Sequence, residues 1–577
     1  MKVNSTAVDE EKSTYLGFDL STQKLKAVQL NNELKVLVTA EVQFDSDLPE
    51  FRTTGGVNAG SRKNEYFVQP VMWVKALDIV MDRLVMEGAD LSTVVALGGS
   101  AQQHGSLYWS RHGVETLKNL DPGKFLHLQV DDSAFVLTRT PIWMDGSAEN
   151  QCLEMEMAIG GRTEMVSLTG SKCYPRFTGP QIRKVYQQRT HAYEDSKRIS
   201  LVSSFLASIF LGDVAPIDYA DASGMNLFDI NTKTWSKACL NACAPDLEER
   251  LGTPVKTSSI IGNICEFFVQ RFGMPETCKV AAFTGDNPSA LSGMLVEKDC
   301  LVMSLGTSDT LMMNLEKPPV LEEGHVLCHP TDEDQFMGLL CFRNGSLVRD
   351  AFKRSEAQNS WQIFSQLLDS TPRGNYGNMA IHFHTMEIIP TAKGTLRWNK
   401  NHTASSPDAA KGISKFTSPE AEIRALIEGQ MLHRRAVAAD MGFHFGEETK
   451  IIATGGASVN KSILQVISDV FNAPVYIQKA SEAALQGAAY RAKYAKYVDD
   501  LRQDISNMSK TNQNAGDEIE KEDTKSTVDI LSYYDFIISY LPNFLERVCE
   551  PSKDSDEIYT PMLERYRQMA NILQSTK

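Results

Sequence analysis

Two short turns carry the first candidate chemistry in this sequence of 577 residues. One lies in GFDLSTQKLKAVQL, residues 17–30, and the other in LVMSLGTSDTLMMNL, residues 301–315; each is a hydroxyl-rich break between two apolar strands. Main-chain N–H groups in tight turns carry partial positive charge, and small side chains let phosphate oxygens approach them. We therefore expect the two turns to bind one polyphosphate. The residues expected to contact it are Thr22, Gly306 and Thr307.

Asp19 places a carboxylate in the first of these turns. Considered alone, it needs no function, because Asp is a common turn residue. The second turn favours a functional role for Asp19 over a purely structural one, since a carboxylate beside bound phosphates can hold Mg²⁺. This ion keeps several waters and takes only one or two protein carboxylates. Asp19 is therefore predicted to bind Mg²⁺, directly or through the ion's water.

A glycine turn between a strand and a helix is the third feature. In KIIATGGASVNKSILQVISDVF, residues 450–471, Gly455 and Gly456 allow a flat ligand to approach the backbone, and Asn460 follows at the start of the helix. A dinucleotide-binding turn is the alternative, but GxGxxG is absent and the next strand lacks the acidic residue that would hold a ribose. An adenine or ribose site is favoured over a hydride cofactor.

Asp286 and Asn287 follow a strand in AFTGDNPSALSG, residues 282–293. Asp-Asn-Pro is also a good start for a helix, so capping by Asp286 remains open. If Asp286 lies in a ligand site, its carboxylate can accept the proton of a substrate hydroxyl as a phosphoryl group arrives. An ordinary Asp pKa of about 3.9 keeps it charged at neutral pH.

Two loops have the donors and acceptors that bind neutral sugars. GGSAQQHGS, residues 98–106, gathers amides around His104, and CYPRFTGPQIRK, residues 173–184, places Arg176 in a Pro/Gly-rich loop. Alone, each is more often structural. Together with the turns, they favour a small-molecule site.

The elements that must position these residues alternate between strands and helices, which is typical of an α/β protein. The length exceeds what one core supports, and the two similar turns indicate a duplicated domain. Residues 502–527 are polar, charged and free of aromatics, as in disordered segments. The predicted divisions are an N-terminal tail (1–13), a first domain (14–296), a second domain (297–500), a disordered insertion (501–530) and a helical tail (531–577).

Composition excludes several classes of protein. A net charge of -15 and a pI near 5.3 argue against nucleic-acid binding. No stretch reaches the roughly 18 apolar residues of a membrane span, and the N-terminus lacks the apolar core of a signal peptide. The ten cysteines show neither a zinc nor a redox spacing, so we expect reduced thiols and a cytoplasmic location. The sequence does not indicate the oligomeric state, for which a monomer is the prior expectation. The Walker signature and the protein-kinase HRD and DFG tripeptides are absent.

Six motifs in order, from about Tyr15 to Ala495, resemble the FGGY family of carbohydrate kinases, within the group that shares the actin and hexokinase ATPase fold. GFDLSTQ, SLGTSDTL and ATGGAS are similar to its two phosphate hairpins and its adenosine turn, and QQHGS, RFTG and TGDN to its sugar site. One departure is Ser21, where many members have Gly; its side chain could narrow the phosphate approach or add a donor.

The resemblance implies two ribonuclease-H-like domains flanking a catalytic cleft, and transfer of the γ-phosphoryl group of ATP to the 5-hydroxyl of D-xylulose. The resemblance also implies that Asp286 is the general base and that Asp19 binds the metal ion. The implied sugar contacts are His104, Arg176, Asp286 and Asn287. The implied nucleotide contacts are Trp361, Gly455, Gly456 and Asn460. Open alternatives are a kinase for another pentulose or polyol, such as ribulose, and a non-catalytic, nucleotide-switched module related to actin or the chaperones.

Overall fold

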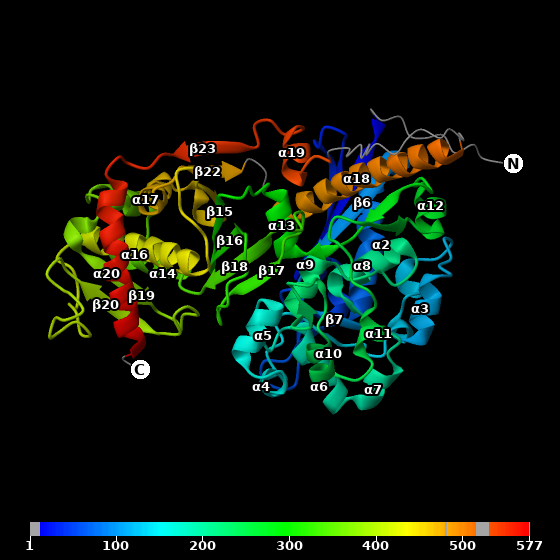
Figure 1. Cartoon of the computed structure of the whole chain (residues 1–577), viewed down its shortest axis with the longest axis horizontal. Helices are drawn as coiled ribbons and strands as arrows, with labels where there is room; N and C mark the ends of the chain where they lie inside the picture. The colour runs from blue at the N-terminus through cyan, green and yellow to red at the C-terminus, as the bar shows by residue number, and fades with distance from the viewer. Residues whose placement is uncertain (1–11, 479–481, 515–529, 576–577) are drawn as a thin grey trace. The chain divides into compact units, whose positions relative to one another are not determined.

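The computed structural model describes residues 12–478, 482–514 and 530–575. The chain divides into two compact units, each built from separate stretches of sequence (Figure 1). Unit 1 comprises residues 1–295, 327–334 and 482–542, and unit 2 comprises residues 296–326, 335–481 and 543–577. No helix in the described part of the chain is long and apolar enough to cross a membrane.

Unit 1 is organised around a mixed seven-stranded sheet with the order β12-β13-β6-β1-β2-β3, in which β14 also pairs with β6. The first predicted hairpin is its centre: β1 is antiparallel to β2, Leu20 pairs with Leu25 at the turn, and β1 is parallel to β6. The strands are β1 (Thr14–Leu20), β2 (Lys24–Leu30), β3 (Val36–Gln43), β6 (Val94–Ala101), β12 (Ile260–Asn263), β13 (Lys279–Ala281) and β14 (Thr284–Gly285).

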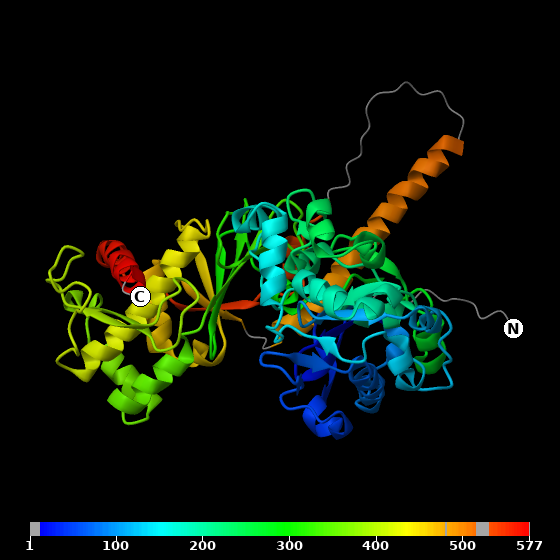
Figure 2. The ribbon, with the colours of Figure 1, turned by 90° about the horizontal axis from the view of Figure 1, so that it is seen from below.

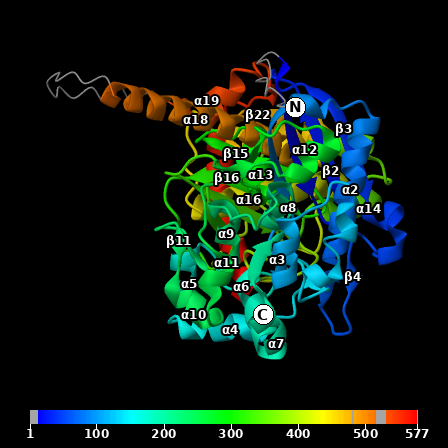
Figure 3. The ribbon, with the colours of Figure 1, turned by 90° about the vertical axis from the view of Figure 1, so that its right-hand side faces the viewer.

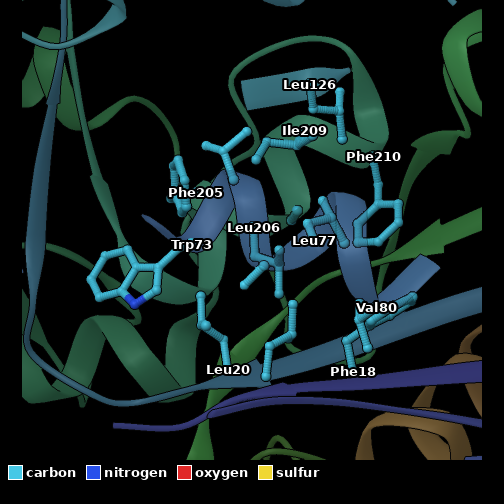
Figure 4. Packing of buried hydrophobic residues seen from close by; sticks show 14 of the residues in the cluster. Phe18, Leu20, Trp73, Leu77, Val80, Leu126, Phe205, Leu206, Ile209 and Phe210 are labelled. Carbon is cyan, nitrogen blue, oxygen red and sulfur yellow. The ribbon is translucent and has the colours of Figure 1, made fainter. Parts of the chain in front are cut away.

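The main hydrophobic core of unit 1 lies on one face of this sheet (Figure 4). Phe18 and Leu20 point from β1 toward α2 and α8, and the rings of Phe18 and Phe210 lie 4.7 Å apart. Figure 3 shows α2 beside β2 and β3. Pro70 begins α2, where proline is favoured because the first N–H of a helix needs no partner within the helix.

Helix α18 covers the opposite face of the same sheet. Gly17 of β1 and Gly98 of β6 are register partners, and a Cβ on either would lie 2.5 Å from a main-chain oxygen of α18. Glycine at these two positions therefore lets the helix backbone lie directly on the strands. Since side chains alternate along a strand, Asp19 is on this same face, two residues after Gly17.

The remaining elements of unit 1 are helices and three small sheets. Its helices are α1 (Phe44–Asp47), α2 (Pro70–Met86), α3 (Arg111–Leu117), α4 (Glu149–Ala158), α5 (Arg162–Thr169), α6 (Thr178–Gln188), α7 (Thr190–Asp195), α8 (Val202–Leu211), α9 (Tyr219–Ala222), α10 (Lys237–Cys243), α11 (Leu247–Leu251), α12 (Glu266–Phe272), α13 (Asp286–Gly293), α18 (Ala483–Asn514) and α19 (Tyr533–Ile538), with 3-10 helices η2 (Pro49–Phe51), η3 (Leu91–Thr93), η4 (Leu126–Leu128), η5 (Asp132–Ala134) and η6 (Ser223–Met225). The small sheets are β4 (Asn58–Ala59), β5 (Tyr66–Val68) and β8 (Thr140–Pro141); β7 (Ser106–Trp109) and β9 (Arg198–Leu201); and β10 (Phe228–Asp229) and β11 (Thr234–Trp235).

Unit 2 repeats the central arrangement in a sheet with the order β17-β18-β16-β15-β21-β22-β23. Here β15 and β16 form the second predicted hairpin, with Leu305 opposite Asp309, and β15 is parallel to β21, as β1 is to β6. The strands are β15 (Cys300–Leu305), β16 (Asp309–Leu315), β17 (His325–Cys328), β18 (Phe336–Phe342), β21 (Lys450–Thr454), β22 (Val475–Gln478) and β23 (Leu545–Cys549), with β19 (Met379–Phe383) and β20 (Gly394–Trp398) as a separate pair.

The helices of unit 2 include the predicted tail helix, α20. Tyr559, Met562, Tyr566 and Met569 are its buried residues at helical spacing, and α20 packs against α16 and α17. The helices are α14 (Ser346–Glu356), α15 (Trp361–Asp369), α16 (Pro419–Asp440), α17 (Lys461–Phe471) and α20 (Ser555–Ser575), with 3-10 helices η7 (Asn375–Gly377) and η8 (Gly456–Val459).

Two features differ from the predicted divisions. Residues 482–500 belong to unit 1 rather than to the second domain, because the small residues of α18 pack on β1, β6 and α13. The helix also continues to Asn514, into the segment predicted to be disordered, and extends beyond the sheet (Figure 2). Hydrogen bonds one turn apart support this extension, such as Gln503 Nε2 to Asp499 Oδ2 at 2.7 Å. Residues 515–529 of the predicted insertion, and 1–11 of the predicted tail, lie outside the described residues.

Candidate active site

Asp19 is buried at the end of β1, with 6% of its surface exposed. Ser100 Oγ donates to Asp19 Oδ1 at 2.7 Å, and Ser21 Oγ donates to Oδ2. Burial raises the pKa of Asp19, and the two hydroxyl donors oppose that rise. The hydroxyl of Ser21, the departure noted in the sequence, thus holds the carboxylate.

Thr22 has a different surrounding from Asp19. Its Oγ1 accepts a hydrogen bond of 2.9 Å from Nε1 of Trp143, a side chain that is 41% exposed. The hydroxyl of Thr22 is therefore engaged by an indole rather than by the Asp19 carboxylate.

Asp286 is the first residue of α13, and Gly285 occupies the capping position. The hypothesis that Asp286 caps the helix is therefore wrong. Its Oδ1 instead accepts two hydrogen bonds from Asn287, one from the main-chain N at 2.8 Å and one from Nδ2 at 3.0 Å. Burial, and next the charge of Asp19, raise the pKa of Asp286 to about 7. The carboxyl is poised to exchange a proton near neutral pH.

His104 occupies a strained turn after β6. It is a non-glycine residue with φ 71°, and Gly105 N donates to Gln103 O across it at 3.0 Å. The imidazole stacks on Phe177 at 4.2 Å, and its Nδ1 lies 2.9 Å from the carbonyl oxygen of Gly224. Burial, aided by the charge of Arg176, lowers the pKa of His104 to about 3. The neutral ring must donate from Nδ1 to the carbonyl, so Nε2 is an acceptor.

Arg176 lies against the same aromatic residue as His104. Its guanidinium carbon is 4.7 Å from the ring centre of Tyr174 and 5.6 Å from that of Phe177. The two loops that the sequence singled out, 98–106 and 173–184, thus meet at Phe177. Unit 1 brings His104 and Arg176 together on that ring, and Gln103 connects this group to Asn287 at 3.0 Å.

A cavity of about 920 Å³ lies within unit 2. It is bordered by the second hairpin, by α14 and α15, and by the glycine turn with the start of α17. Five residues predicted to contact nucleotide line it: Gly306, Thr307, Trp361, Gly456 and Asn460.

Gly455 lies directly behind this cavity. Its φ of 83° and ψ of -179° belong to a region that only glycine adopts easily, and a Cβ there would lie 2.8 Å from Leu305 O. A Cβ on Gly456 would meet nothing within 4 Å. Gly455 therefore brings the turn close to β15, whereas Gly456 leaves open space for a ligand.

Asn460 caps α17 through its Oδ1, which accepts from Ile463 N at 3.1 Å. Its Nδ2 is 3.0 Å from Ser365 Oγ, which fixes the amide between α17 and α15. Trp361, at the start of α15, is 39% exposed and lies beneath Lys353 Nζ at 4.9 Å. The cavity thus has an exposed aromatic face beside an ordered amide, a combination that suits a flat heterocycle.

Comparison with known proteins identifies the family. Residues 127–293 match the N-terminal domain of the FGGY family of carbohydrate kinases, and residues 301–496 match its C-terminal domain. The chain belongs to this family. Xylulose kinase from Rattus norvegicus is 48% identical over 477 residues, covering 83% of this chain and 87% of the rat protein. Xylulose kinase 2 from Arabidopsis thaliana is 43% identical over 489 residues, covering 84% and 87% of the two chains.

Solved structures of FGGY kinases have the same fold. Xylulose kinase from Rhodospirillum rubrum aligns with a TM-score of 0.74 at 13% identity over 98% of this chain and 99% of its own. Glycerol kinase from Plasmodium falciparum, solved with ADP, aligns with a TM-score of 0.71 at 15% identity over 97% and 98%. The predicted α/β fold with two domains is confirmed.

The second hairpin of this FGGY kinase is held by buried ion pairs. Arg349 donates to Asp309 from Nη1 to Oδ2 at 2.9 Å and from Nη2 to Oδ1 at 2.8 Å, and Arg434 Nη2 donates to Oδ2 at 2.9 Å. A carboxylate neutralised by two arginines is unsuited to bind a metal ion. Asp19 in the first hairpin is held by hydroxyl groups, so it keeps its capacity to serve a cation.

The described residues contain no group of three or more His, Cys, Asp or Glu side chains that could hold a metal ion. Mg²⁺ bound with a nucleotide needs no such group, because that ion takes one or two carboxylates and completes its shell with waters and phosphate oxygens. Asp19, a single buried carboxyl held by two hydroxyl groups, fits such a role.

Three further buried residues belong to the site, and the sequence indicated no individual role for them: Ser100, Gln103 and Asp221. Ser100 bonds Asp19, and Gln103 bonds both Asn287 and Asp221. The amide-rich loop signalled that Gln103 lies near a ligand, but Asp221 is 118 residues away from it along the chain. No local pattern connects that pair.

Proposed function

We propose that this FGGY kinase transfers the γ-phosphoryl group of ATP to the 5-hydroxyl of D-xylulose, which gives D-xylulose 5-phosphate and ADP. The reaction class follows from the family. The substrate is proposed because rat and Arabidopsis proteins named xylulose kinases match over more than four fifths of this chain. The observation that carries the chemistry is Asp286, a carboxyl with a pKa near 7 beside an ordered asparagine.

Asp286 is the proposed general base. Because Oδ1 already accepts two hydrogen bonds from Asn287, Oδ2 is the oxygen that takes the proton of the 5-hydroxyl. The sugar oxygen then forms its bond to the γ-phosphorus as the bond from that phosphorus to the β,γ-bridging oxygen breaks and ADP leaves. A positioned base of this kind contributes about 10²- to 10⁴-fold in rate.

The proposed sugar contacts are Asp286, Asn287, His104 and Arg176. His104 offers Nε2 as an acceptor, since its Nδ1 is used by Gly224 O. Arg176 offers donors, and burial, aided by the charge of Arg176, keeps His104 neutral. Holding the imidazole neutral matters because a protonated ring would have no acceptor for a hydroxyl.

The proposed nucleotide contacts are Thr22, the turn residue Gly455, and five residues that line the 920 Å³ cavity of unit 2: Gly306, Thr307, Trp361, Gly456 and Asn460. The exposed face of Trp361 can stack on the base, and the main chain after β15 can donate to phosphate oxygens. Asp19 is the proposed Mg²⁺ contact. When bound with ATP, the ion supplies positive charge that offsets the charge of the phosphate oxygens.

The proposal is tested by coupled ADP release with a panel of sugars at fixed ATP and Mg²⁺. We expect the highest kcat/KM with D-xylulose, and a higher value with ribulose or a polyol would favour the first alternative. ATP turnover that no sugar changes would favour a nucleotide-switched module. If an Asp286→Ala protein keeps most of the rate, Asp286 is not the general base. The control is Asp132→Asn, which changes an exposed carboxylate outside the site.

A further inference from the structure

A line of hydrogen bonds leads from the interior of unit 1 to Asn287. Ser203 Oγ donates to Asp221 Oδ2 at 2.5 Å, and Gln103 Nε2 donates to Asp221 Oδ1 at 3.3 Å. Gln103 Oε1 in turn accepts from Asn287 Nδ2 at 3.0 Å. Asp221 is 1% exposed and Gln103 is 5% exposed, so water does not compete for these bonds.

The directions of these hydrogen bonds determine which side-chain atom of Asn287 remains for a ligand. Asp286 Oδ1 accepts from both the main-chain N and Nδ2 of Asn287, so Asn287 presents its NH₂ group, and Gln103 meets that group with Oε1 and gives its own NH₂ group to Asp221 Oδ1. Asn287 then meets two acceptors, Gln103 Oε1 and Asp286 Oδ1, and gives one Nδ2 hydrogen to each. Both hydrogens of the amide are used. The atom of the Asn287 side chain that remains for a ligand is Oδ1, an acceptor.

Close packing keeps Gln103 in this orientation. A Cβ on Gly285 would lie 2.5 Å from Gln103 Cγ and 2.8 Å from Asp221 Oδ1. Any side chain at Gly285 would therefore displace the glutamine. Its φ of -66° suits any residue, so the requirement for glycine here is steric and not conformational.

Burial, and next the charge of Asp218, raise the pKa of Asp221 to about 8. The bond from Gln103 keeps its direction when Asp221 binds a proton, because the proton can lie on Oδ2, beside Ser203 Oγ, while Oδ1 stays an acceptor.

We propose that Gln103 is a positioning residue that sets Asn287 as an acceptor, so that the sugar hydroxyl facing Asn287 must donate its proton. This inference rests on the proposed function. It defines the site chemically: Asp286 Oδ2, His104 Nε2 and Asn287 Oδ1 all accept, and Arg176 donates. The substrate class is a polyhydroxy compound whose hydroxyls at three points act as donors.

The first test compares KM and kcat of two variants at one position. Gln103→Met keeps the length of the side chain and removes both bonds, so we expect KM for D-xylulose to rise about 10-fold with a smaller change in kcat. Gln103→Glu keeps an acceptor for Asn287, so we expect a smaller rise in KM than with Met. Gln270→Met, on the exposed side of α12, is the matched control.

Two further variants separate positioning from folding. Asp221→Asn keeps an acceptor at Oδ1 and should raise KM less than Asp221→Leu does. Gly285→Ala leaves Gln103 in the sequence but displaces it, and should raise KM as Gln103→Met does. Equal effects of Asn and Leu at 221, or an unchanged KM in Gly285→Ala, would contradict the proposed role.

The decisive test uses pairs of deoxy and deoxyfluoro analogues of D-xylulose as competitors. Fluorine cannot donate a hydrogen bond. When it replaces the hydroxyl that faces Asn287, the fluoro analogue should therefore bind the wild-type enzyme as weakly as the deoxy analogue does. In Gln103→Met, the loss of affinity caused by fluorine should be smaller, because residue 103 no longer holds the Asn287 amide and the amide can turn. If fluoro analogues at every position bind as tightly as D-xylulose, the role inferred for Gln103 is wrong, but the proposed kinase activity is not contradicted. If wild type shows no sugar-dependent ADP release, the proposed function itself fails.

Discussion

Asn287 donates twice to a single oxygen of Asp286, from its main chain at 2.8 Å and from its side chain at 3.0 Å. Oδ1 is thereby occupied, and Oδ2 is the oxygen that can receive a proton. The same two bonds fix the carboxyl plane, so the base is oriented before a substrate arrives.

Asp286→Asn should lose activity without losing the fold. The amide keeps an oxygen to accept from Asn287 but cannot take a proton, so we expect kcat to fall about 10²- to 10⁴-fold. KM for ATP should change little. Steady-state kinetics give both values, and a loss confined to KM for the sugar would show that Asp286 binds but does not act as the base.

Activity should rise with pH through neutrality. The base must be ionised, and the pKa of Asp286 is raised to about 7 by burial and by Asp19. At pH 6 the rate should be about one tenth of its plateau, because about that fraction is ionised. A pH profile of kcat/KM between pH 5.5 and 8.5 measures this, and a flat profile would exclude Asp286 as the titrating group.

Stability should change with pH in the opposite sense. A carboxyl whose pKa is raised on folding binds more protons in the folded state between its unfolded and folded pKa values, about 4 and about 7. Its contribution to the free energy of unfolding is present below that window and is lost as pH rises through it. Asp286→Asn should therefore gain thermal stability relative to wild type between pH 4.5 and pH 8. A difference in Tm that stays constant with pH would contradict the shifted pKa.

Two variants of Asn460 separate its cap from its proposed nucleotide contact. Asn460→Ala removes the bond to Ile463 N, so it should cost about 1 kcal/mol of stability and raise KM for ATP. Asn460→Asp keeps the capping oxygen and places a negative charge at a helix N-terminus, which is favourable there. It should keep the stability and still raise KM for ATP. Thermal unfolding and kinetics together decide, and an unchanged KM in both variants would remove Asn460 from the nucleotide site.

The two glycines of the adenosine-type turn should respond differently to alanine. At Gly455 a Cβ would collide with Leu305, and φ is positive, so Gly455→Ala should cost at least about 1 to 2 kcal/mol. Gly456→Ala meets open space and should leave Tm unchanged while raising KM for ATP. Equal Tm values for the two variants would contradict the described geometry.

The sequence predicted those parts of the structure that local patterns encode. The apolar strands around Asp19 and around Thr307 indicated both hairpins. Chain order could not show that residues 482–500 return to unit 1, because that depends on glycines such as Gly17 and Gly98 that admit α18. Chain order also could not show that Asp19 and Asp309 differ in their capacity to bind a metal ion, since arginines 40 and 125 residues away neutralise Asp309.

Among the candidate site residues, those close to a turn were the easiest to find. His104 and Arg176 stood out in loops rich in amides and in Pro and Gly, and the structure places both on Phe177. Asp221 gave no signal, because its significance comes from Gln103 and Ser203, which reach it only after folding. The roles assigned to the site residues remain predictions that the variants above examine.

The late position of α18 has a consequence for synthesis on the ribosome. The strands β1 and β6 are translated early, yet the helix that covers one face of their sheet lies at residues 483–514. Until most of the polypeptide has emerged, that face, with Asp19 on it, has no covering helix and is a surface for chaperones or for aggregation. Transcripts cut short before codon 482 should therefore yield insoluble product, however complete the first 300 residues are.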